Sequence, residues 1–216
     1  MRRPTLVALF SLLVITPLAV ATAQSSGPVY LPVIAREATL TPTATTTPTP
    51  TATPTTTPTA TATPTGCQPA PEEQAIADRM LAHPEQARPA LRCHPILERV
   101  ARERALDMAV RGYESHVNPD GFGPNYLVRQ AGYPLSSTYS SSLTANSIEV
   151  MYYGYGFSPT PNPDNPWNWW MNSSIHRTML LGLTSFFVAQ DEYGVGHVYV
   201  PGSNYGHYWI VLTARQ

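Results

Sequence analysis

The chain has 216 residues, of which 13 are basic and 14 are acidic, so its formal net charge at pH 7 is -1. This balance indicates neither a nucleic-acid-binding surface nor an acidic solubilising shell. Its 23 prolines are unevenly distributed, and its 12 tyrosines and 4 tryptophans lie almost wholly in the C-terminal two thirds. A hydrophobic core must therefore form in that part of the chain.

The first 23 residues have the pattern of an export signal. Arg2 and Arg3 precede the apolar stretch Leu6–Val20, and residues 21–23 (ATA) place small side chains where a signal peptidase cleaves. The stretch is short and Pro17 interrupts it, so it makes a poor membrane span; an uncleaved anchor is the alternative. The sequence predicts a secreted, extracellular or cell-surface protein in an oxidising compartment, with no transmembrane span in the mature chain.

Two segments separate this signal from the globular part. Residues 24–40 contain one apolar island, VYLPVI, which is too short to fold alone and is interpreted as a surface-retention segment or as a vestigial linker. Residues 41–66 consist almost only of threonine, proline and alanine. Such a sequence buries nothing and cannot offset its ordering entropy, so we predict a disordered, extended stalk that O-glycosylation would suit.

Residues 67–216 have a normal size for a single domain with one core. Their only cysteines are Cys67 and Cys93. In an exported protein an even pair predicts a disulfide, and this spacing fits neither a zinc knuckle nor a CxxC redox site. The closed loop is expected to stabilise the domain by roughly 3–4 kcal/mol and to attach the end of the stalk to the start of the second helix.

Helical patterns dominate the first half of this domain. A first helix is predicted to begin at Pro71 and to end before the HP dipeptide at 83–84. A second begins at Pro95, carries apolar residues on one face with Arg and Glu opposite, and ends at the C-cap Gly112. A third is predicted over residues 124–132.

The second half of the domain predicts strands. Residues 193–200 and 207–213, joined by the turn PGSNYG, have the pattern of a β-hairpin, and FFVAQ at 186–190 is predicted to be a third strand. IEVMYYGYGF at 148–157 suits either a buried strand or a short helix. Helices first and sheet last is an α+β pattern, with the helices packed on an antiparallel sheet.

The stretch WMNSSIHR, residues 170–177, concentrates chemically versatile side chains. Ser173 and Ser174 are predicted to form the N-cap of a short helix that Gly182 closes. This places His176 in the first turn of that helix, where the exposed amide ends disfavour a protonated ring. The imidazole is therefore biased toward its neutral form, which can bind a metal.

The same stretch also has a purely structural interpretation. Trp170 would then pack in the core, at the end of a helix that Asn165-Pro166 caps, while His176 and Arg177 would satisfy backbone carbonyls. From these residues alone the structural interpretation is the more frequent one.

Three ionisable residues lie beside loop or cap signals: His116 in SHVNPDG, Glu149 in NSIEVM and His176 in SSIHR. Two neutral imidazoles and a carboxylate are a suitable ligand set for a divalent transition metal, with water completing the coordination. Without metal, the same three groups could share protons. Their spacing does not by itself show that they converge.

The order of these motifs resembles the CAP superfamily, which includes cysteine-rich secretory proteins, antigen 5 proteins and pathogenesis-related proteins. The motifs are SHVNPDG, a Glu-centred segment, WMNSxxHR, YGVG and a terminal YW strand, and they are similar above all to the secreted bacterial SCP-domain members. The resemblance covers residues 72–215. It implies a three-layer α-β-α sandwich with an open cleft, in which His116 and His176 match the cleft histidines and Glu149 the first cleft glutamate.

The chain departs from the family pattern at two places. The second cleft glutamate of the better-known members is replaced by Ser173, and Glu149 is followed by Val150-Met151 instead of Asn-Ile. A four-residue metal or acid–base scheme therefore does not carry over whole. The expected metal ligands are His116, His176 and Glu149, supported in the cleft by the side chains of Ser173, Trp170 and Arg177.

The favoured functional hypothesis is a non-catalytic, monomeric binding module displayed on the stalk. Its cleft would hold a divalent cation (zinc, calcium or magnesium), a small apolar or glycan ligand, or an envelope component. The chain has no GxSxG motif, and Ser173 takes the place of a second carboxylate.

Two alternatives remain. In a metal-assisted hydrolase of peptides or envelope polymers, His116, Glu149 and His176 would hold zinc and a bound water would attack. In a structural protein, the two histidines would only be hydrogen-bond partners.

The other histidines and aromatic residues have weaker assignments. His83 and His94 lie at helix ends as surface or capping groups, whereas His197 and His207 lie on the predicted hairpin. His207 either lines the cleft or is a satisfied histidine at the sheet edge. A cluster of aromatic residues either lines a ligand groove or packs in the core: Tyr152, Tyr153, Tyr155, Trp167, Trp169 and Trp170.

Overall fold

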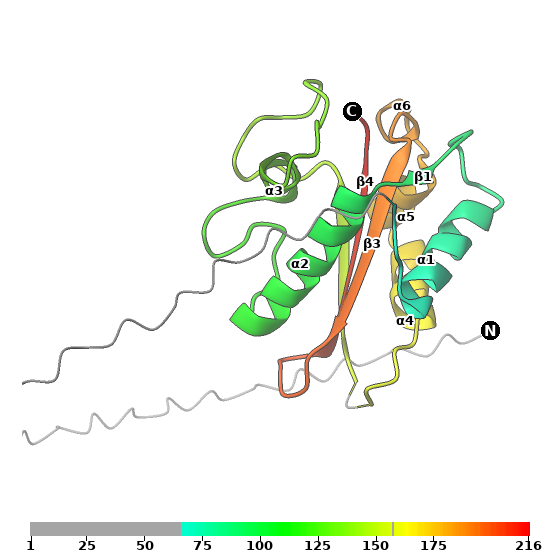
Figure 1. Cartoon of the computed structure of the whole chain (residues 1–216). Coiled ribbons are helices and arrows are strands. Elements are labelled where there is room, and N and C mark those ends of the chain that lie inside the picture. The colour runs from blue at the N-terminus through cyan, green and yellow to red at the C-terminus, as the bar shows by residue number, and fades with distance from the viewer. Residues whose placement is uncertain (1–65, 157) are drawn as a thin grey trace, which may run out of the picture. The chain divides into compact units, whose positions relative to one another are not determined.

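The computed structural model describes residues 66–156 and 158–216 (Figure 1). The predicted signal peptide (1–23), the segment 24–40 and residues 41–65 of the predicted stalk lie outside the described residues. Among the helices of the described part, none is long and apolar enough to cross a membrane.

The described residues contain six helices and four strands. The helices are α1 (Pro71–Ala82), α2 (Pro95–Arg111), α3 (Pro124–Gln130), α4 (Asp164–Asn172), α5 (Ser174–Leu181) and α6 (Ser185–Val188). The strands are β1 (Arg92–Cys93), β2 (Glu149–Tyr155), β3 (Glu192–Tyr199) and β4 (Gly206–Ala214). The α+β class expected from the sequence is confirmed, and the segment that suited either a strand or a helix forms β2.

The four strands form one sheet in the order β1-β3-β4-β2. Strands β3 and β4 form the predicted antiparallel hairpin, and β2 pairs antiparallel with β4. The two-residue strand β1 runs parallel to β3, with Arg92 opposite Glu192 and Cys93 opposite Tyr193. The expectation of a purely antiparallel sheet is therefore wrong at this edge, where the chain adds a short parallel strand just before α2 begins.

Helices cover both faces of the sheet, and each face has its own apolar cluster. Figure 1 shows α2 and α3 on one side of the sheet and α1, α4 and α5 on the other. The first cluster joins residues of α2 and α3 to alternate residues of β4, including Leu97, Val128 and Ile210. The second joins α1, α4 and α5 to the opposite residues of the sheet, including Ile76 and Trp209.

The YGVG motif brings α2 directly against β3. A Cβ atom on Gly194 would lie 2.2 Å from the backbone nitrogen of Glu98, and one on Gly196 would lie 2.3 Å from the carbonyl carbon of Ala101. Real Cβ contacts are not this short, so only glycine permits the observed separation. The two glycines thereby fix the position of α2, the helix that carries Arg104 to the candidate site.

Helix ends follow the sequence signals with small shifts. Helix α1 ends at Ala82, before the HP dipeptide. Gly112 is the C-cap of α2; its φ is 66°, and its backbone N–H donates a hydrogen bond to Met108 O at 2.9 Å. Helix α4 begins at Asp164, so the predicted Asn165-Pro166 cap lies inside its first turn.

The predicted strand at 186–190 is wrong, because this segment forms the one-turn helix α6 and a loop. The hydroxyl oxygen of Thr184 accepts from the N–H of Phe187 at 3.3 Å, and Thr184 O accepts from Val188 N at 2.8 Å. Threonine is a good N-cap, and this local cap overrides the strand preference of the aromatic residues.

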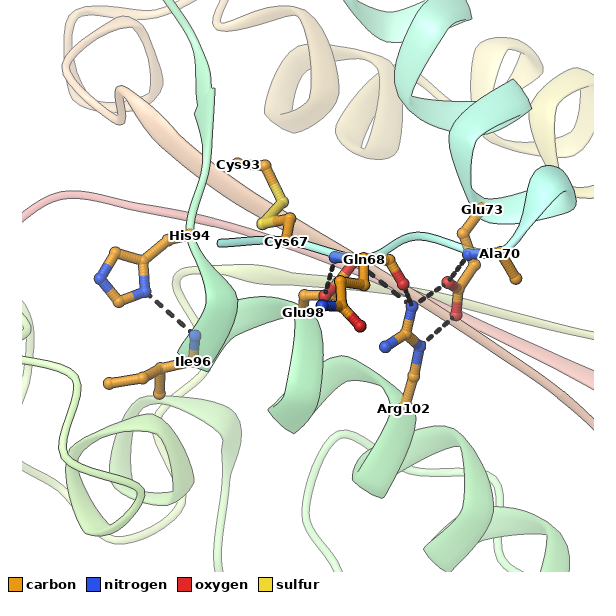
Figure 2. Close-up of a disulfide and its surroundings, with 9 residues drawn as sticks. All are labelled: Cys67, Gln68, Ala70, Glu73, Cys93, His94, Ile96, Glu98 and Arg102. Atoms are coloured by element: carbon orange, nitrogen blue, oxygen red, sulfur yellow. Dashed lines mark hydrogen bonds and ion pairs between the residues drawn. A yellow bond between two sulfur atoms is a disulfide. The ribbon is translucent and has the colours of Figure 1, made fainter. Parts of the chain in front are cut away.

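The predicted disulfide between Cys67 and Cys93 is present. Figure 2 shows it at the start of α2, next to a network in which Arg102 contacts two buried carboxylates, those of Glu73 and Glu98. The Glu73 carboxylate also accepts from the N–H of Ala70 at 2.7 Å. The disulfide attaches the first residues of the domain to β1, just before α2, and the ion pair between Arg102 and Glu73 attaches α1 to α2 itself.

Candidate functional site

The loop after α2 and the start of β2 bring His116 and Glu149 together. His116 Nδ1 lies 2.9 Å from Glu149 Oε1. A carboxylate only accepts hydrogen bonds, so the ring donates its Nδ1–H, and in the neutral imidazole the lone pair is on Nε2. Glu149 thereby fixes both the tautomer and the orientation of His116.

Glu149 is itself held by Arg104 of α2. The guanidinium donates Nε–H to Oε2 at 2.9 Å and an Nη2–H to Oε1 at 3.1 Å, and both side chains are buried. Burial alone would raise the pKa of Glu149, but the charge of Arg104 and the hydrogen bonds from His116 and Arg104 bring this pKa below its ordinary value. Glu149 is therefore an ionised carboxylate with both oxygens engaged.

Arg104 also holds the loop that carries His116. Its Nη2 donates to Ser115 O at 3.3 Å and to His116 O at 3.1 Å, and its Nη1 donates to Tyr113 OH at 2.5 Å. The expectation that the arginines of α2 lie opposite its apolar face is wrong for this residue. The pattern did contain the signal, because Arg104 follows Leu97 by seven residues and precedes Met108 by four, which places it on the apolar face.

His176 is the third residue of α5, as predicted from the cap pattern. Ser173 is the N-cap residue of α5, but its hydroxyl makes no capping bond; instead its Oγ lies 2.7 Å from His176 Nδ1. Partial burial, and then the charge of His116, lower the pKa of His176 below its ordinary value. The direction agrees with the sequence-based expectation of a neutral ring, but the cause is burial and the charge of His116 and not the start of the helix.

His116 and His176 both line two neighbouring hollows in the surface. The first, of about 450 Å³, is lined by His116, Met151, Tyr152, Tyr153, Trp169 and His176. The second, of about 280 Å³, is lined by the two histidines together with Asn146, Ser147, Glu149, Ile175, Met179 and Phe187. The two histidines thus lie where an aromatic hollow meets a second hollow of mixed polar and apolar side chains, and we call the pair of hollows the histidine groove.

The remaining predicted support residues occupy different places. Trp170 is fully buried, and its Nε1–H donates to Met151 O at 3.0 Å, so it supports the groove from within the core. Its neighbour Trp169 lines the groove instead, with its ring centroid 4.7 Å from that of His176. Arg177 forms an ion pair with Glu85 and lines neither hollow of the groove.

Helix α5 is braced by a buried arginine that sequence reasoning missed. Arg88 donates from Nη1 to Leu180 O and from Nη2 to Met179 O, each at 2.7 Å, and from Nε to Phe187 O at 3.0 Å. Burial lowers the pKa of Arg88 to about 10. It satisfies the last carbonyls of the helix that carries His176, where a cation also suits the helix dipole.

The donor chemistry of the groove suits zinc better than calcium or magnesium. The two histidines offer imidazole nitrogens, which zinc prefers, whereas calcium and magnesium require oxygen ligands. Glu149 offers oxygen, but both of its oxygens are engaged by Arg104 and His116. Within the described residues, the only group of three or more ligand residues with donor atoms within 4.8 Å of one another comprises Cys67, Cys93 and Glu98, and its sulfurs form the disulfide.

Comparisons with known proteins gave one kind of match. No family model and no curated protein matches the chain. Among solved structures, the chain is similar to an outer surface protein from Borrelia burgdorferi, with a TM-score of 0.47 and 16% sequence identity over 66% of this chain and 91% of that one.

Proposed function

We propose that this protein is an exported, stalk-displayed member of the CAP superfamily whose domain is a non-catalytic binding module. The groove binds a divalent cation, best matched by zinc, through Nε2 of His116 and of His176. A small ligand with an apolar face occupies the aromatic hollow beside the cation. Glu149 acts as a positioning residue and not as a ligand.

The observation that carries this proposal is the way both imidazoles are oriented. Glu149 accepts from Nδ1 of His116 and the Ser173 hydroxyl lies at Nδ1 of His176. Metal-binding histidines commonly donate the N–H of their second ring nitrogen to an oxygen acceptor, which leaves the other nitrogen for the metal. The Ser173 hydroxyl can accept from His176 in this way. Both rings line the same two hollows, and the lowered pKa of His176 favours the neutral, ligating form.

The aromatic hollow supports a ligand with an apolar face. Trp169 is 49% exposed, although large apolar side chains usually avoid such exposure, and Ile175 beside the second hollow is 63% exposed. Sugars and other small molecules with one apolar face pack well on exposed aromatic rings. Trp169, next to His176, would supply this contact.

A metal-assisted hydrolase is the less favoured function. Among the described residues that line the two hollows, Glu149 is the only carboxylate. A general base works best with a pKa near the operating pH, and the pKa of Glu149 is lowered by its contact with Arg104. Glu149 is therefore better suited to holding His116 than to removing a proton from water.

Export and display rest on other features. The disulfide between Cys67 and Cys93 suits an oxidising compartment outside the cytoplasm.

Membership of the CAP superfamily is supported by the place of the residues that carry the resemblance. They meet at the groove: the loop of His116, the strand of Glu149 and the helix of His176. The YGVG glycines allow α2 and its Arg104 to approach β3.

The test is a zinc titration of the full-length chain by calorimetry, with metal content measured independently. His116→Ala and His176→Ala are each expected to lose one zinc equivalent or to raise its dissociation constant at least about 10-fold, because one of two protein ligands is removed. His83→Ala is the matched control, since His83 lines neither hollow and accepts from Glu85 N at 3.2 Å.

Two results would contradict the proposal. One is unchanged zinc binding in both groove variants while circular dichroism shows native folding. The other is hydrolysis of a peptide or an envelope polymer that requires zinc and is lost in His176→Ala, which would favour the hydrolase instead.

A further inference from the structure

A second pair of histidines lies outside the histidine groove, on the β3–β4 hairpin. His197 Nε2 of β3 is 3.0 Å from His207 Nδ1 of β4, and the two rings lie nearly parallel, with centroids 5.3 Å apart and an interplanar angle of 16°. Both residues are largely buried: the side chain of His197 is 4% exposed and His207 is 8% exposed. Two ring nitrogens therefore face each other at close range away from bulk water.

The outer nitrogens of the pair contact groups that can only accept hydrogen bonds. His197 Nδ1 lies 3.1 Å from Glu72 Oε1, and His207 Nε2 lies 2.8 Å from Ser158 O. Both contacts call for an N–H on the histidine. When both rings are neutral, these two hydrogens are the only N–H hydrogens that the two rings have. The two inner nitrogens then face each other with lone pairs.

A cation between the two inner nitrogens would relieve this contact, and a third proton is the first candidate. A metal ion is the second candidate, because the two inner nitrogens that face each other at 3.0 Å are the unprotonated nitrogens through which neutral imidazoles bind a metal.

We propose that His197 Nε2 and His207 Nδ1 bind one divalent transition-metal ion, with zinc as the reference ion. Zinc–nitrogen bonds of about 2.0–2.1 Å and tetrahedral angles put two ligand nitrogens about 3.3 Å apart. The observed 3.0 Å requires a shift of only a few tenths of an ångström. The carboxylate of Glu72 and the carbonyl of Ser158 are the kinds of partner that orient metal-binding histidines in proteins.

Aromatic rings pack against both histidines, and a hollow lies beside His207. The ring of Trp209 lies with its centroid 4.0 Å from that of His197, and the Tyr199 ring is 4.7 Å from His207. Glu73 Oε1 accepts from the backbone N–H of His197 at 3.0 Å. A hollow of about 190 Å³, lined in part by His207 and Trp209, offers space for the water ligands that would complete the coordination.

This site shares no ligand with the histidine groove, so the two can be tested separately. The experiment is a zinc titration of the full-length double variant His116→Ala/His176→Ala, in which the groove ligands are absent. This variant is expected to bind one zinc ion per chain. Adding His207→Ala is expected to abolish that binding, whereas adding His83→Ala is expected to leave it unchanged.

Glu72→Gln provides a variant that keeps both ligands and removes only the negative charge beside His197 Nδ1. Loss of a partner that orients a metal ligand typically weakens metal binding by about 10- to 100-fold. In the same double-variant background, Glu72→Gln is therefore expected to raise the zinc dissociation constant by that factor.

The inference is overturned if the folded double variant binds no zinc, with nitrogen NMR showing instead a proton shared between His197 and His207. It is also overturned if zinc binding survives His207→Ala. Neither result tests zinc binding in the histidine groove. That binding is measured separately, in the double variant His197→Ala/His207→Ala, which lacks the hairpin ligands.

Discussion

Arg104 of α2 and Glu149 of β2 form a buried ion pair, with Nε 2.9 Å from Oε2 and side chains that are 3% and 0% exposed. The pair joins α2 to β2. The YGVG glycines fix the position of α2, and β2 lines the histidine groove. The Glu149 carboxylate also accepts from Nδ1 of His116. The orientation of His116 therefore depends on Arg104, although Arg104 lines neither hollow of the histidine groove.

Removing one partner of this pair should destabilise the domain strongly. Glu149→Leu leaves the Arg104 guanidinium buried without a carboxylate, and breaking such a pair costs about 3–5 kcal/mol. Replacing both partners with apolar residues of similar size, Arg104→Met and Glu149→Leu, should cost less than the sum of the single changes. Urea unfolding of the wild type, the two single variants and the double variant measures this coupling. If the losses in the free energy of unfolding are additive, the two side chains do not depend on each other, and the prediction is contradicted.

The lowered pKa of His176 gives a pH dependence with a definite sign. The unfolded chain has the ordinary histidine pKa near 6.5 and the folded chain a lower one, so the unfolded state binds more protons between these values. Stability contributed by the neutral ring is therefore present above pH 6.5 and is lost as the pH falls toward the folded pKa. Proton NMR of the ring should show a midpoint below that of an exposed histidine; a midpoint above 6.5 would contradict the inferred environment.

The close contact of α2 with β3 predicts the effect of adding a methyl group. Gly196→Ala would place a Cβ 2.3 Å from Ala101 C, so α2 must shift, and such overpacking typically costs about 1–3 kcal/mol. Because α2 carries Arg104, zinc affinity in the groove should fall as well. Gly66→Ala is the control, since a Cβ there has nothing within 4 Å. Equal unfolding midpoints for the two variants would contradict the packing argument.

The disulfide should stabilise the domain through the unfolded state. Cys67 and Cys93 are 26 residues apart, and closing a loop of this length contributes roughly 3–4 kcal/mol in the chain-entropy model. Cys67→Ser/Cys93→Ser should lower the free energy of unfolding, measured in urea, by about this amount. The ion pairs of Arg102 should keep the first residues of the domain in place, so zinc binding in the groove should persist. An unchanged free energy of unfolding would contradict the stabilising role of the bond.

The sequence was most informative where the signal is local. Helix starts at proline, the glycine that closes α2 and the alternation that predicted the hairpin all depend on the conformational preferences of a few neighbouring residues. The prediction of a strand at 186–190 was wrong because a different local signal prevailed. The helix cap formed by Thr184 outweighed the strand preference of the aromatic residues. The parallel strand β1 has only two residues, too few for any periodic pattern.

The site was predicted as a set of residues but not as an arrangement. The motifs identified His116, Glu149 and His176, and all three line one hollow of the groove. Local pattern could not show that Glu149 is held by Arg104, since that contact joins residues 45 positions apart. The sequence placed His197 and His207 on the hairpin, but the orientation of their rings also depends on Glu72 and Ser158, which lie in distant segments of the chain.

Anomalous diffraction at the zinc edge, from crystals of the protein soaked in zinc, shows whether His116 and His176 bind one metal ion in the groove. We expect an anomalous peak within bonding distance, about 2.0–2.1 Å, of Nε2 of both rings, with Glu149 still paired to Arg104. A groove without such a peak in crystals that bind zinc elsewhere, or a peak bonded to Glu149 instead of the two imidazoles, would contradict this expectation.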